Sequence, residues 1–324
     1  MPEDIINAAP PPDLAACKFI YTFASHESER ELCRLELSEL LKRVPQAGRN
    51  WVCSDRLVDP DRSPFITARM DVLWTGSTAE EVACHAAGIS LGESTFKVVC
   101  LKAGEPLSYE EKRSLERLVG GSIRGKAEMK SPDVTFGLML ADGEWMFGRL
   151  QEPERAWLDH KRKPQNYSTG LSSRVARALV NISAPETAGT QMIDPCCGMG
   201  NVLIEALSMG VDIRGCDINP LAVRGARANL THYGYSDKMV SLGDMNDLSG
   251  HFDTAVLDLP YNVCSVFPSE EKRRMLSSLR RMADRAVIVS TEPLWESLPA
   301  AGWNAIDMVT TRKGSFVREI WLCE

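Results

Sequence analysis

The sequence predicts an α/β protein whose second half is a mostly parallel sheet that ends in an antiparallel hairpin. From about residue 172 onward, short apolar runs alternate with amphipathic stretches, a pattern typical of parallel sheets with helices on both faces. A glycine turn joins the first run to a helical stretch within residues 191–209. The last two runs, 304–311 and 315–322, flank Arg312-Lys313-Gly314, and such a closing hairpin differs from an all-parallel dinucleotide-binding sheet.

The composition is ordinary for a soluble protein. The 324 residues suffice for two domains, and 44% are apolar, 25% are charged and the net charge is −7. No uncharged apolar run reaches the ~18 residues that suggest a membrane span. Residues 1–17 lack a signal-peptide pattern, so we expect a flexible leader and a cytoplasmic protein. Neither half is basic, so any nucleic-acid contact must come from local clusters.

The ten cysteines do not predict a metal site. None forms a Cys-x-x-Cys pair, which zinc sites usually need, and disulfide frameworks are typical of small secreted chains. Cys100, Cys216 and Cys323 lie inside apolar runs, where a thiol is a small buried hydrophobe. We therefore expect reduced, mostly structural cysteines and no bound metal.

The first half is predicted to be α+β. Its expected strands are residues 18–24, 65–75 and 95–101, and its expected helices are 29–43, 77–88 and 108–119. Ser77 with Glu80 has the spacing of a capping box at the second helix start. Ser108 with Glu111 has the same spacing at the third.

Two further features complete the first half. Residues 133–140 and 144–149 are expected to pair as a hairpin, because Asp142-Gly143 is a strong turn signal. Glu36 and Glu39 have the spacing of paired carboxylates, but we expect them to lie on a solvated helix face. The half contains no glycine-rich phosphate loop and no nucleophile constellation.

Residues 151–170 are rich in charge, proline and asparagine and are predicted to link the halves. Their cluster His160-Lys161-Arg162-Lys163 is either a solvated connector or a phosphate contact. The strands expected beyond it are residues 191–194, 212–216, 239–242, 252–257 and 285–290. The helices expected there are 172–181, 202–209, 220–233, 269–282 and 292–301.

The first of these strands ends at a turn suited to a ligand. Met192 and Ile193 run into Asp194, and the turn that follows carries Gly198 and Gly200. Glycine permits positive φ and lets a ligand approach the backbone without meeting a Cβ. Because open α/β sheets bind ligands at the carboxyl ends of their strands, we expect this turn to face one.

Two more strand ends carry suitable residues. Asp217 follows Asp194 by 23 residues, where an acid is well placed to bind ribose hydroxyls, although it could also cap the next helix. Asp258-Leu259-Pro260-Tyr261 ends a third strand. The three strand ends together favour a nucleotide-like cofactor site over an ordinary strand–loop–helix connection, which the glycines alone leave open.

These segments resemble S-adenosylmethionine-dependent amino-methyltransferases. Asp194-Pro195-Cys196-Cys197-Gly198-Met199-Gly200, followed by Leu203-Ile204-Glu205-Ala206, looks like their motif I. Asp258-Leu259-Pro260-Tyr261 looks like motif IV, with Leu259 in place of the usual first proline. Gly170-Leu171-Ser172 with residues 176–181 is similar to the segment before motif I in tRNA guanosine-N2 methyltransferases with a THUMP domain.

The first half agrees with this resemblance more loosely. Residues 88–91, 96–98 and 130–134 resemble a THUMP domain preceded by a small ferredoxin-like unit. The implied organisation is a leader (1–17), a ferredoxin-like unit (18–75), a THUMP-like RNA-binding domain (76–150), a linker (151–170) and a Rossmann-like class I methyltransferase domain (171–324).

The resemblance also implies the cofactor, S-adenosyl-L-methionine, and its binding residues. These are Asp194, Cys196, Cys197, Gly198, Gly200, Asn201, Asp217, Ile218, Asp244 and Met245. The backbone of the glycine turn would hold the methionine part, Asp217 the ribose and Ile218 the adenine face. Asp244 and Met245 would contact the adenine amine, although Asp244 could equally be a turn acid.

The chemistry accounts for the remaining residue types. An exocyclic amine donates its lone pair into the base and is a poor nucleophile, and hydrogen bonds from its N–H groups to a carboxylate and a backbone carbonyl favour the pyramidal, attacking form. Asp258 would be the carboxylate, and Leu259 or Pro260 would supply the carbonyl, with Pro260 stiffening the turn. Tyr261 would stack on a base that has left its helix. Positioning and electrostatics suffice, without a metal or a covalent intermediate.

The implied function is methyl transfer to the N2 amine of a guanosine in tRNA, usually position 10 in this family. Two alternatives stay open: an adenine-N6 or other amino-methyltransferase on another nucleic acid, and a non-catalytic RNA-binding protein with a decayed fold. A tRNA sulfur-inserting enzyme would need a Ser-Gly-Gly-x-Asp-Ser loop, which the chain lacks. The sequence identifies no protein partner. Basic residues that could contact tRNA are Arg162, Lys163, Arg273, Arg274, Arg280, Arg281, Arg312 and Lys313.

Overall fold

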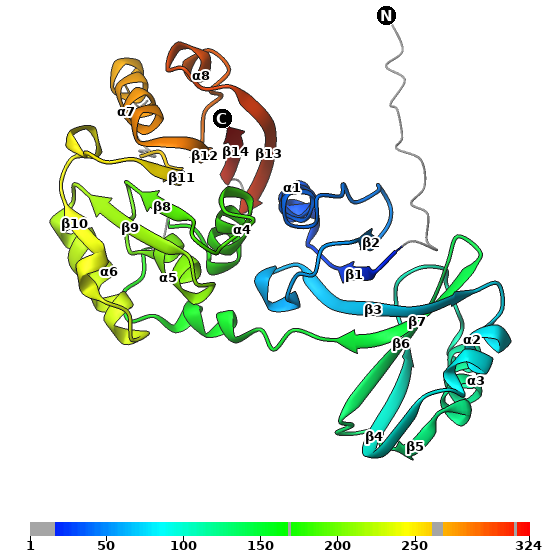
Figure 1. Cartoon of the computed structure of the whole chain (residues 1–324). Helices are drawn as coiled ribbons and strands as arrows, with labels where there is room; N and C mark the ends of the chain where they lie inside the picture. Colours follow the sequence, from blue (N-terminus) through cyan, green and yellow to red (C-terminus); the bar gives the residue numbers. More distant parts are fainter. Residues whose placement is uncertain (1–16, 168–169, 261–267, 314–315) are drawn as a thin grey trace, which may run out of the picture. The chain divides into compact units, whose positions relative to one another are not determined.

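The computed structural model describes residues 17–167, 170–260, 268–313 and 316–324. The chain divides into two compact units that are interleaved along the sequence (Figure 1). The first unit comprises Met1–Ala24, Pro45–Pro60 and Ile66–Pro153, and the second comprises Ser25–Val44, Asp61–Phe65 and Glu154–Glu324. Two short segments of the N-terminal half therefore belong with the C-terminal half.

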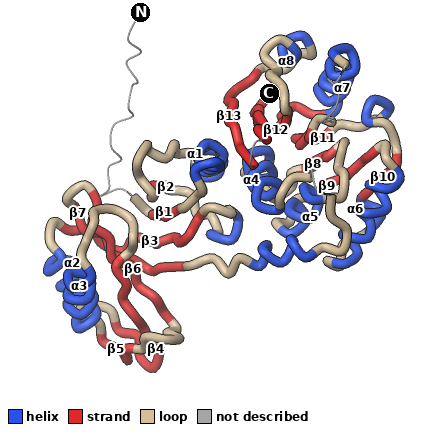
Figure 2. The backbone as a smooth tube through the Cα atoms, turned by 180° about the vertical axis from the view of Figure 1, so that it is seen from behind, coloured by secondary structure: helices blue, strands red, loops and turns tan. Residues whose placement is uncertain are grey.

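The first unit is built on one seven-stranded sheet with the strand order β2-β1-β3-β7-β6-β4-β5. The strands are β1 (Phe19–Phe23), β2 (Trp51–Ser54), β3 (Ile66–Gly76), β4 (Ser90–Cys100), β5 (Arg124–Ala127), β6 (Val134–Ala141) and β7 (Glu144–Gln151). Figure 2 shows helices α2 (Ala79–Ala86) and α3 (Tyr109–Ser122) side by side near β4 and β6. Because β3 pairs with β7, the boundary expected after residue 75 falls within a single sheet.

The local signals of the first unit are mostly confirmed. Ser108 and Glu111 form the expected capping box at α3. Asp142 and Gly143 both have positive φ, 51° and 78°, as the tight hairpin turn between β6 and β7 requires. The cap expected at Ser77 is wrong by one residue, because the helix N-cap is Thr78, whose hydroxyl accepts the backbone N–H of Glu81.

The expectation that the cysteines are all reduced is wrong for one pair. Cys17 and Cys53 form a disulfide with their Cα atoms 5.8 Å apart. Cys17 lies two residues before the start of β1, and Cys53 lies on the neighbouring β2, a strand that apolar alternation did not reveal. Within the described ranges no group of three or more His, Cys, Asp or Glu side chains is placed to hold a metal ion, and no helix is long and apolar enough to cross a membrane.

The second unit has the predicted parallel sheet with a closing hairpin, in the order β10-β9-β8-β11-β12-β14-β13. The strands are β8 (Gln191–Asp194), β9 (Asp212–Asp217), β10 (Val240–Leu242), β11 (Phe252–Asp258), β12 (Ala283–Ser290), β13 (Ala305–Lys313) and β14 (Phe316–Cys323). The first five strands in this order are parallel, and β14 pairs antiparallel with both β12 and β13.

Helices cover both faces of this second sheet. The helices are α4 (Ser173–Ser183), α5 (Asn201–Ser208), α6 (Pro220–His232), α7 (Ser269–Met282) and α8 (Ser297–Ala300). In Figure 1, α4, α5 and α6 lie on one side of the strands and α7 and α8 on the other. Ile193, Ala255 and Leu257 pack into the apolar core on the α7 side, because every second side chain of a strand faces the same way.

Helix α1 (Arg30–Leu41) belongs to this second unit, which corrects the expectation for Glu36. The Glu36 side chain is fully buried rather than solvated. Its carboxylate accepts hydrogen bonds from Asn181 Nδ2 of α4 at 2.7 Å and from the Ser63 hydroxyl at 2.9 Å. Burial raises the pKa of Glu36 to about 7, against the lowering effect of these two donors.

The expected linker is also largely packed against the second unit. His160 Nδ1 lies 2.8 Å from Glu205 Oε1 on α5, and the backbone of Gln165 exchanges two hydrogen bonds with the Asn229 side chain. Lys163 is 7% exposed, and burial lowers its pKa. Lys161 and Arg162 stay exposed, whereas His160 and Lys163 pack against the second unit, so the four residues do not form one continuous phosphate-binding surface.

Candidate active site

Three carboxylates lie at the carboxyl ends of three adjacent parallel strands. The central strand β8 ends at Asp194, with β9 and Asp217 on one side and β11 and Asp258 on the other. Residues directly opposite each other on paired strands face the same side of a sheet. Met192 lies opposite Thr254, whose hydroxyl lies 2.6 Å from that of Ser183 on α4.

The same alternation places all three acids on the α4 face. Asp194 is two residues beyond Met192, and Asp258 is four beyond Thr254. Asp194 lies opposite Gly215, so Asp217, two residues further, shares that face. The structure therefore brings together the strand ends that the sequence singled out, and Figure 1 shows β9, β8 and β11 side by side.

Asp217 ties the glycine turn to the next helix. Its two carboxylate oxygens accept the backbone N–H groups of Gly198 and Asn219, each at 2.8 Å. Asn219 itself caps α6 by accepting the N–H of Leu221, so Asp217 acts on the turn rather than as the helix cap. Each carboxylate oxygen keeps a further lone pair with which it can accept a hydrogen bond.

The two turn glycines have different tasks. Gly198 has φ 52°, and a Cβ at this position would meet no heavy atom within 4 Å, so the turn is open there. Gly200 has φ 79° at the N-terminus of α5 and lies against Ala226 of α6. Cys197 hydrogen-bonds Cys216 O through its backbone N–H, and Asn201 donates from Nδ2 to Leu171 O at 2.8 Å. These contacts fix the turn while leaving one side of it accessible.

Asp194 is buried inside this arrangement. It is 3% exposed, and burial raises its pKa well above the usual range, with further raising by the charges of Asp258 and Asp217. Burial likewise raises the pKa of the Cys196 and Cys197 thiols. Both cysteines are therefore neutral at pH 7, and we assign neither a nucleophilic role.

Asp258 combines burial with an unused acceptor. Its Oδ1 is inaccessible to solvent and accepts no hydrogen bond within the described part of the chain. Burial raises the pKa of Asp258 to about 7, and the positive charge of Arg318 works in the opposite direction. An unsatisfied buried carboxylate oxygen is costly and marks a position where a donor from a ligand would be favourable.

The residues after Asp258 are only partly described. Leu259 is buried and donates its N–H to Val289 O of β12 at 3.0 Å, while Pro260 is exposed. Tyr261 lies outside the described residues. Leu259, which departs from the motif, thus packs into the core and extends the pairing of β11 with β12.

The last group of expected cofactor residues lies at the ends of β9 and β10. Ile218 is 70% exposed, so its side chain is free to pack on a ligand. Met245 is buried, with its sulfur 3.7 Å from Cys196 Sγ. Asp244 Oδ1 accepts two hydrogen bonds from Asn246, one from its backbone N–H and one from its side-chain amide, which is the geometry of a turn acid.

The expected basic residues do not act alike. Arg280 and Arg281 on α7 donate to backbone carbonyls of Gly302 and Leu248, so they brace the fold, whereas Arg273 and Arg274 are exposed. Sequence reasoning missed Arg318 on β14, which acts on Asp258. Its only signal is the alternation of Phe316, Arg318 and Ile320, which does not show that β14 also pairs with β12 beside β11.

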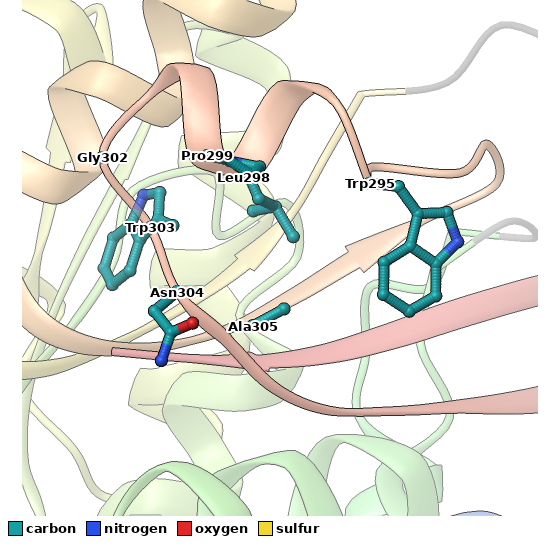
Figure 3. A pocket seen from close by; sticks show the side chains of 7 residues that line it. All are labelled: Trp295, Leu298, Pro299, Gly302, Trp303, Asn304 and Ala305. Atoms are coloured by element: carbon teal, nitrogen blue, oxygen red, sulfur yellow. The ribbon is translucent and has the colours of Figure 1, made fainter.

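A separate groove of ≈ 400 Å³ lies beside α8 and the start of β13 (Figure 3). It is lined by Trp295, Leu298, Pro299, Gly302, Trp303, Asn304 and Ala305. Leu298 and Trp303 belong to the core on the α7 side of the sheet. The groove is therefore on the opposite face from the three carboxylates.

Comparison with protein families defines the class of the second unit. Residues 160–290 match the family described as RMKL-like, methyltransferase domain. This range contains the glycine turn and all three acids. This part of the second unit is thus similar to the methyltransferase domain of the RMKL-like family.

Individual relatives narrow this class. The tRNA (guanine(10)-N2)-dimethyltransferase of Methanothermobacter thermautotrophicus is 33% identical over 176 residues, covering 51% of this chain and 52% of the relative. The protein of the same name from Pyrococcus abyssi is 27% identical, covering 59% and 61%. The U6 snRNA (guanine-N(2))-methyltransferase THUMPD2 of Mus musculus is 26% identical, covering 52% and 33%.

These names confirm the resemblance of the chain to guanosine-N2 methyltransferases. The chain spans about half the length of the curated relatives that it matches. Among solved structures, Thermus thermophilus TrmN is similar, with a TM-score of 0.48 at 17% identity over 94% of this chain and 99% of that one.

Proposed function

We propose that the protein is an S-adenosylmethionine-dependent RNA methyltransferase that acts on the N2 amine of a guanosine, with tRNA as the substrate. The observation that carries this proposal is the placement of Asp194, Asp217 and Asp258 on one face at three adjacent strand ends. The relatives that match this part of the chain are named as guanine-N2 methyltransferases, which favours guanine over adenine.

The residues at the first two strand ends fit the cofactor. Asp217 keeps lone pairs for the ribose hydroxyls, and the open side of Gly198 leaves room for a ligand beside the turn. The full proposed set is Asp194, Cys196, Cys197, Gly198, Gly200, Asn201, Asp217, Ile218, Asp244 and Met245. When bound, S-adenosylmethionine supplies an electrophilic methyl group on its sulfonium, and S-adenosylhomocysteine is the leaving group.

The residues at the third strand end fit the amine. The unpartnered Oδ1 of Asp258 would accept one N–H of the amine, which directs the nitrogen lone pair away from the ring and toward the methyl carbon. As the new N–C bond forms, the nitrogen becomes positively charged, and the nearby carboxylate stabilises that charge. The amine then loses one proton to Asp258 or to water. We assign Leu259, Pro260 and Tyr261 to the same pocket, as a carbonyl acceptor and a stacking ring.

The remaining assignments follow from the class of substrate. We assign residues 76–150 of the first unit, together with the sheet they share with residues 18–75, to RNA binding as a THUMP-like region. Exposed arginines of α7, Arg273 and Arg274, are available for phosphates. A tRNA-modifying role places the protein in the cytoplasm. The named U6 snRNA relative makes a small nuclear RNA the second candidate substrate.

A methylation assay followed by nucleoside mass spectrometry tests the proposal. The purified chain is incubated with S-adenosylmethionine and either unmodified tRNA or U6 RNA, with the Asp258→Ala variant as a control. We expect N2-methylguanosine in tRNA with the native chain and none with the variant. N6-methyladenosine as the product, or transfer that survives Asp258→Ala, would contradict the proposal.

A further inference from the structure

We infer that Arg318 is a positioning residue that acts through Asp258, because its positive charge keeps that carboxylate ionised for the target amine. This inference rests on the proposed function, since it assigns a task to Asp258 in that reaction. It concerns a residue of the closing hairpin that lies outside both motifs and outside residues 160–290.

The strand register places the two side chains on one face of the sheet. Asp258 lies opposite Val289 of β12, and Val289 lies opposite Ile320 of β14. Asp258 and Ile320 therefore face the same side, and Arg318, two residues from Ile320, faces that side as well.

The register also fixes the direction of Arg318. Because β14 runs antiparallel to β12, the step from Ile320 to Arg318 leads toward the carboxyl ends of β11 and β12. Neighbouring strands are about 4.8 Å apart, so β14 lies about 10 Å from β11, a gap that a long arginine side chain can largely cover toward Asp258. Arg318 is thus placed just beyond the strand end at which the amine would bind.

The surroundings of Arg318 hold its guanidinium in place. The side chain is 7% exposed, and its Cζ lies 4.6 Å from the centroid of the Phe316 ring. A guanidinium is charged at every accessible pH and is seldom buried without an anion nearby. Stacking on the Phe316 ring restricts the guanidinium, and its positive charge acts on the Asp258 carboxylate.

The other charged groups around Asp258 do not replace Arg318. Asp194 on β8 and Asp217 on β9 are negative when ionised, and the Cys196 thiol of the turn is neutral. On α4, Arg174 is paired with Glu29 and Arg177 with Glu205. Within the described residues, Arg318 is the positive group that lowers the pKa of Asp258, which burial raises to about 7.

The consequence is a defined pH dependence. Only the ionised carboxylate is free to accept the N–H of an amine with either oxygen. With Arg318 present, the pKa of Asp258 is about 7, so the ionised form is populated at neutral pH. Without it, the pKa of Asp258 rises further, and the protonated form dominates at neutral pH.

The test compares Arg318→Met, which removes the charge, with Arg318→Lys, which keeps it. For Arg318→Met we expect kcat at pH 7 to fall about fivefold or more, with the acid limb of the kcat profile displaced upward by at least about one pH unit. Arg318→Lys should restore most of the activity and the original limb. Arg214→Gln, at an exposed position on β9, is the matched control and should leave the profile unchanged.

A second measurement separates this inference from the proposed reaction. Isotope-edited infrared titration of the carboxyl groups, with Asp258→Asn to identify the band, reports the pKa of Asp258 without turnover. We expect an upward shift of that midpoint in Arg318→Met and a smaller one in Arg318→Lys. If the titration midpoint of Asp258 does not move in Arg318→Met, the inference is wrong even where methyl transfer is found. If the midpoint shifts but no methyl transfer is found, the effect of Arg318 on Asp258 is confirmed and the proposed function is wrong. Calorimetric binding of S-adenosylhomocysteine and a thermal melt check that each variant is folded, and Arg318→Gln replaces Arg318→Met if that variant does not fold.

Discussion

The environment of Asp258 and its proposed role favour different protonation states of the same side chain. Its burial favours the neutral acid, whereas the proposed chemistry needs the carboxylate, and its Oδ1 has no partner in the described chain. Folded proteins keep such strained polar groups mainly where function requires them. The Asp-x-Pro-Tyr pattern identified Asp258 from the sequence. No such pattern pointed to Arg318 as its neighbour, because β14 lies near β11 only since both strands pair with β12.

This conflict predicts a stability change for Asp258→Asn. The pKa of Asp258 in the folded protein, about 7, lies above its ordinary value of 3.8, so the aspartate destabilises the fold increasingly as pH rises between these values. At pH 8 the variant should be more stable by up to about 4 kcal/mol, the equivalent of three pKa units, while near pH 4 the two proteins should be alike. Urea unfolding at both pH values measures the difference, and a variant that is less stable at pH 8 would contradict the electrostatic account.

The prediction for Asp217 concerns cofactor affinity rather than the pH dependence of stability. Asp217→Ala removes the proposed ribose acceptor, the hydrogen bond from Gly198 of the glycine turn and the one from Asn219 at the start of α6. We expect S-adenosylhomocysteine affinity to fall by about 10–100-fold, the worth of one or two charge-assisted hydrogen bonds. Asp212→Asn, at the exposed start of the same strand, is the control. Equal affinities in calorimetry for the native chain and Asp217→Ala would remove Asp217 from the cofactor site.

At the scale of elements, the sequence predicted what local periodicity can specify. The strands of the parallel sheet, the helices between them and the closing hairpin follow from apolar runs and turn residues. Strand β5, with all four residues exposed, has no apolar alternation, and β2 has only four residues. Helix α8 is likewise shorter than expected, Ser297–Ala300. The Cys17–Cys53 disulfide could not be predicted without β2.

Helix α1 illustrates a limit of local reasoning. Glu36 and Glu39 have the spacing of a charged outer face, yet Glu36 is buried. Its carboxylate accepts a hydrogen bond from the side-chain amide of Asn181, 145 residues away in the sequence. Glu39 pairs with Arg285 of β12 at 2.8 Å. Nothing within the helix marks these partners, since they become neighbours only when α1 packs on the second unit.

The buried position of Glu36 predicts a large effect of its removal. Glu36→Ala leaves Asn181 Nδ2 and the Ser63 hydroxyl without this acceptor and creates a cavity, so we expect about 2–4 kcal/mol of destabilisation. Glu31→Ala is the control on the same helix, because Glu31 makes an exposed pair with Arg34 and should contribute less than about 1 kcal/mol. Similar unfolding free energies for the two variants would show that α1 does not depend on the Glu36 contacts.

At the scale of the whole molecule, the two units are not consecutive segments of the chain. The sequence predicted boundaries at residues 75, 150 and 170, but the second unit also includes Ser25–Val44 and Asp61–Phe65. Arg177 of α4 donates to the backbone carbonyls of Asp61 and Arg62, which joins that short segment to the methyltransferase domain. Composition shifts locate linkers, but they contain no information about such interleaving.

This interleaving predicts the pattern of hydrogen exchange. Amides of α1 should exchange with the same opening free energy as those of α4, because cooperative units follow buried contacts rather than sequence order. They should differ from amides of β1 and β2, which flank α1 in the sequence but belong to the first unit. Exchange of α1 together with β1 and β2 would show that the N-terminal segment is a cooperative domain of its own.

A crystal structure with S-adenosylhomocysteine and a guanosine-containing RNA would show where both ligands bind relative to the three carboxylates. We expect the ribose hydroxyls to lie within hydrogen-bonding distance of the Asp217 carboxylate. We also expect the guanine N2 amine to lie within such distance of Asp258 Oδ1, with the cofactor sulfur facing that amine. A cofactor bound elsewhere, or a guanine whose amine points away from Asp258, would contradict the proposed methyl transfer at this site.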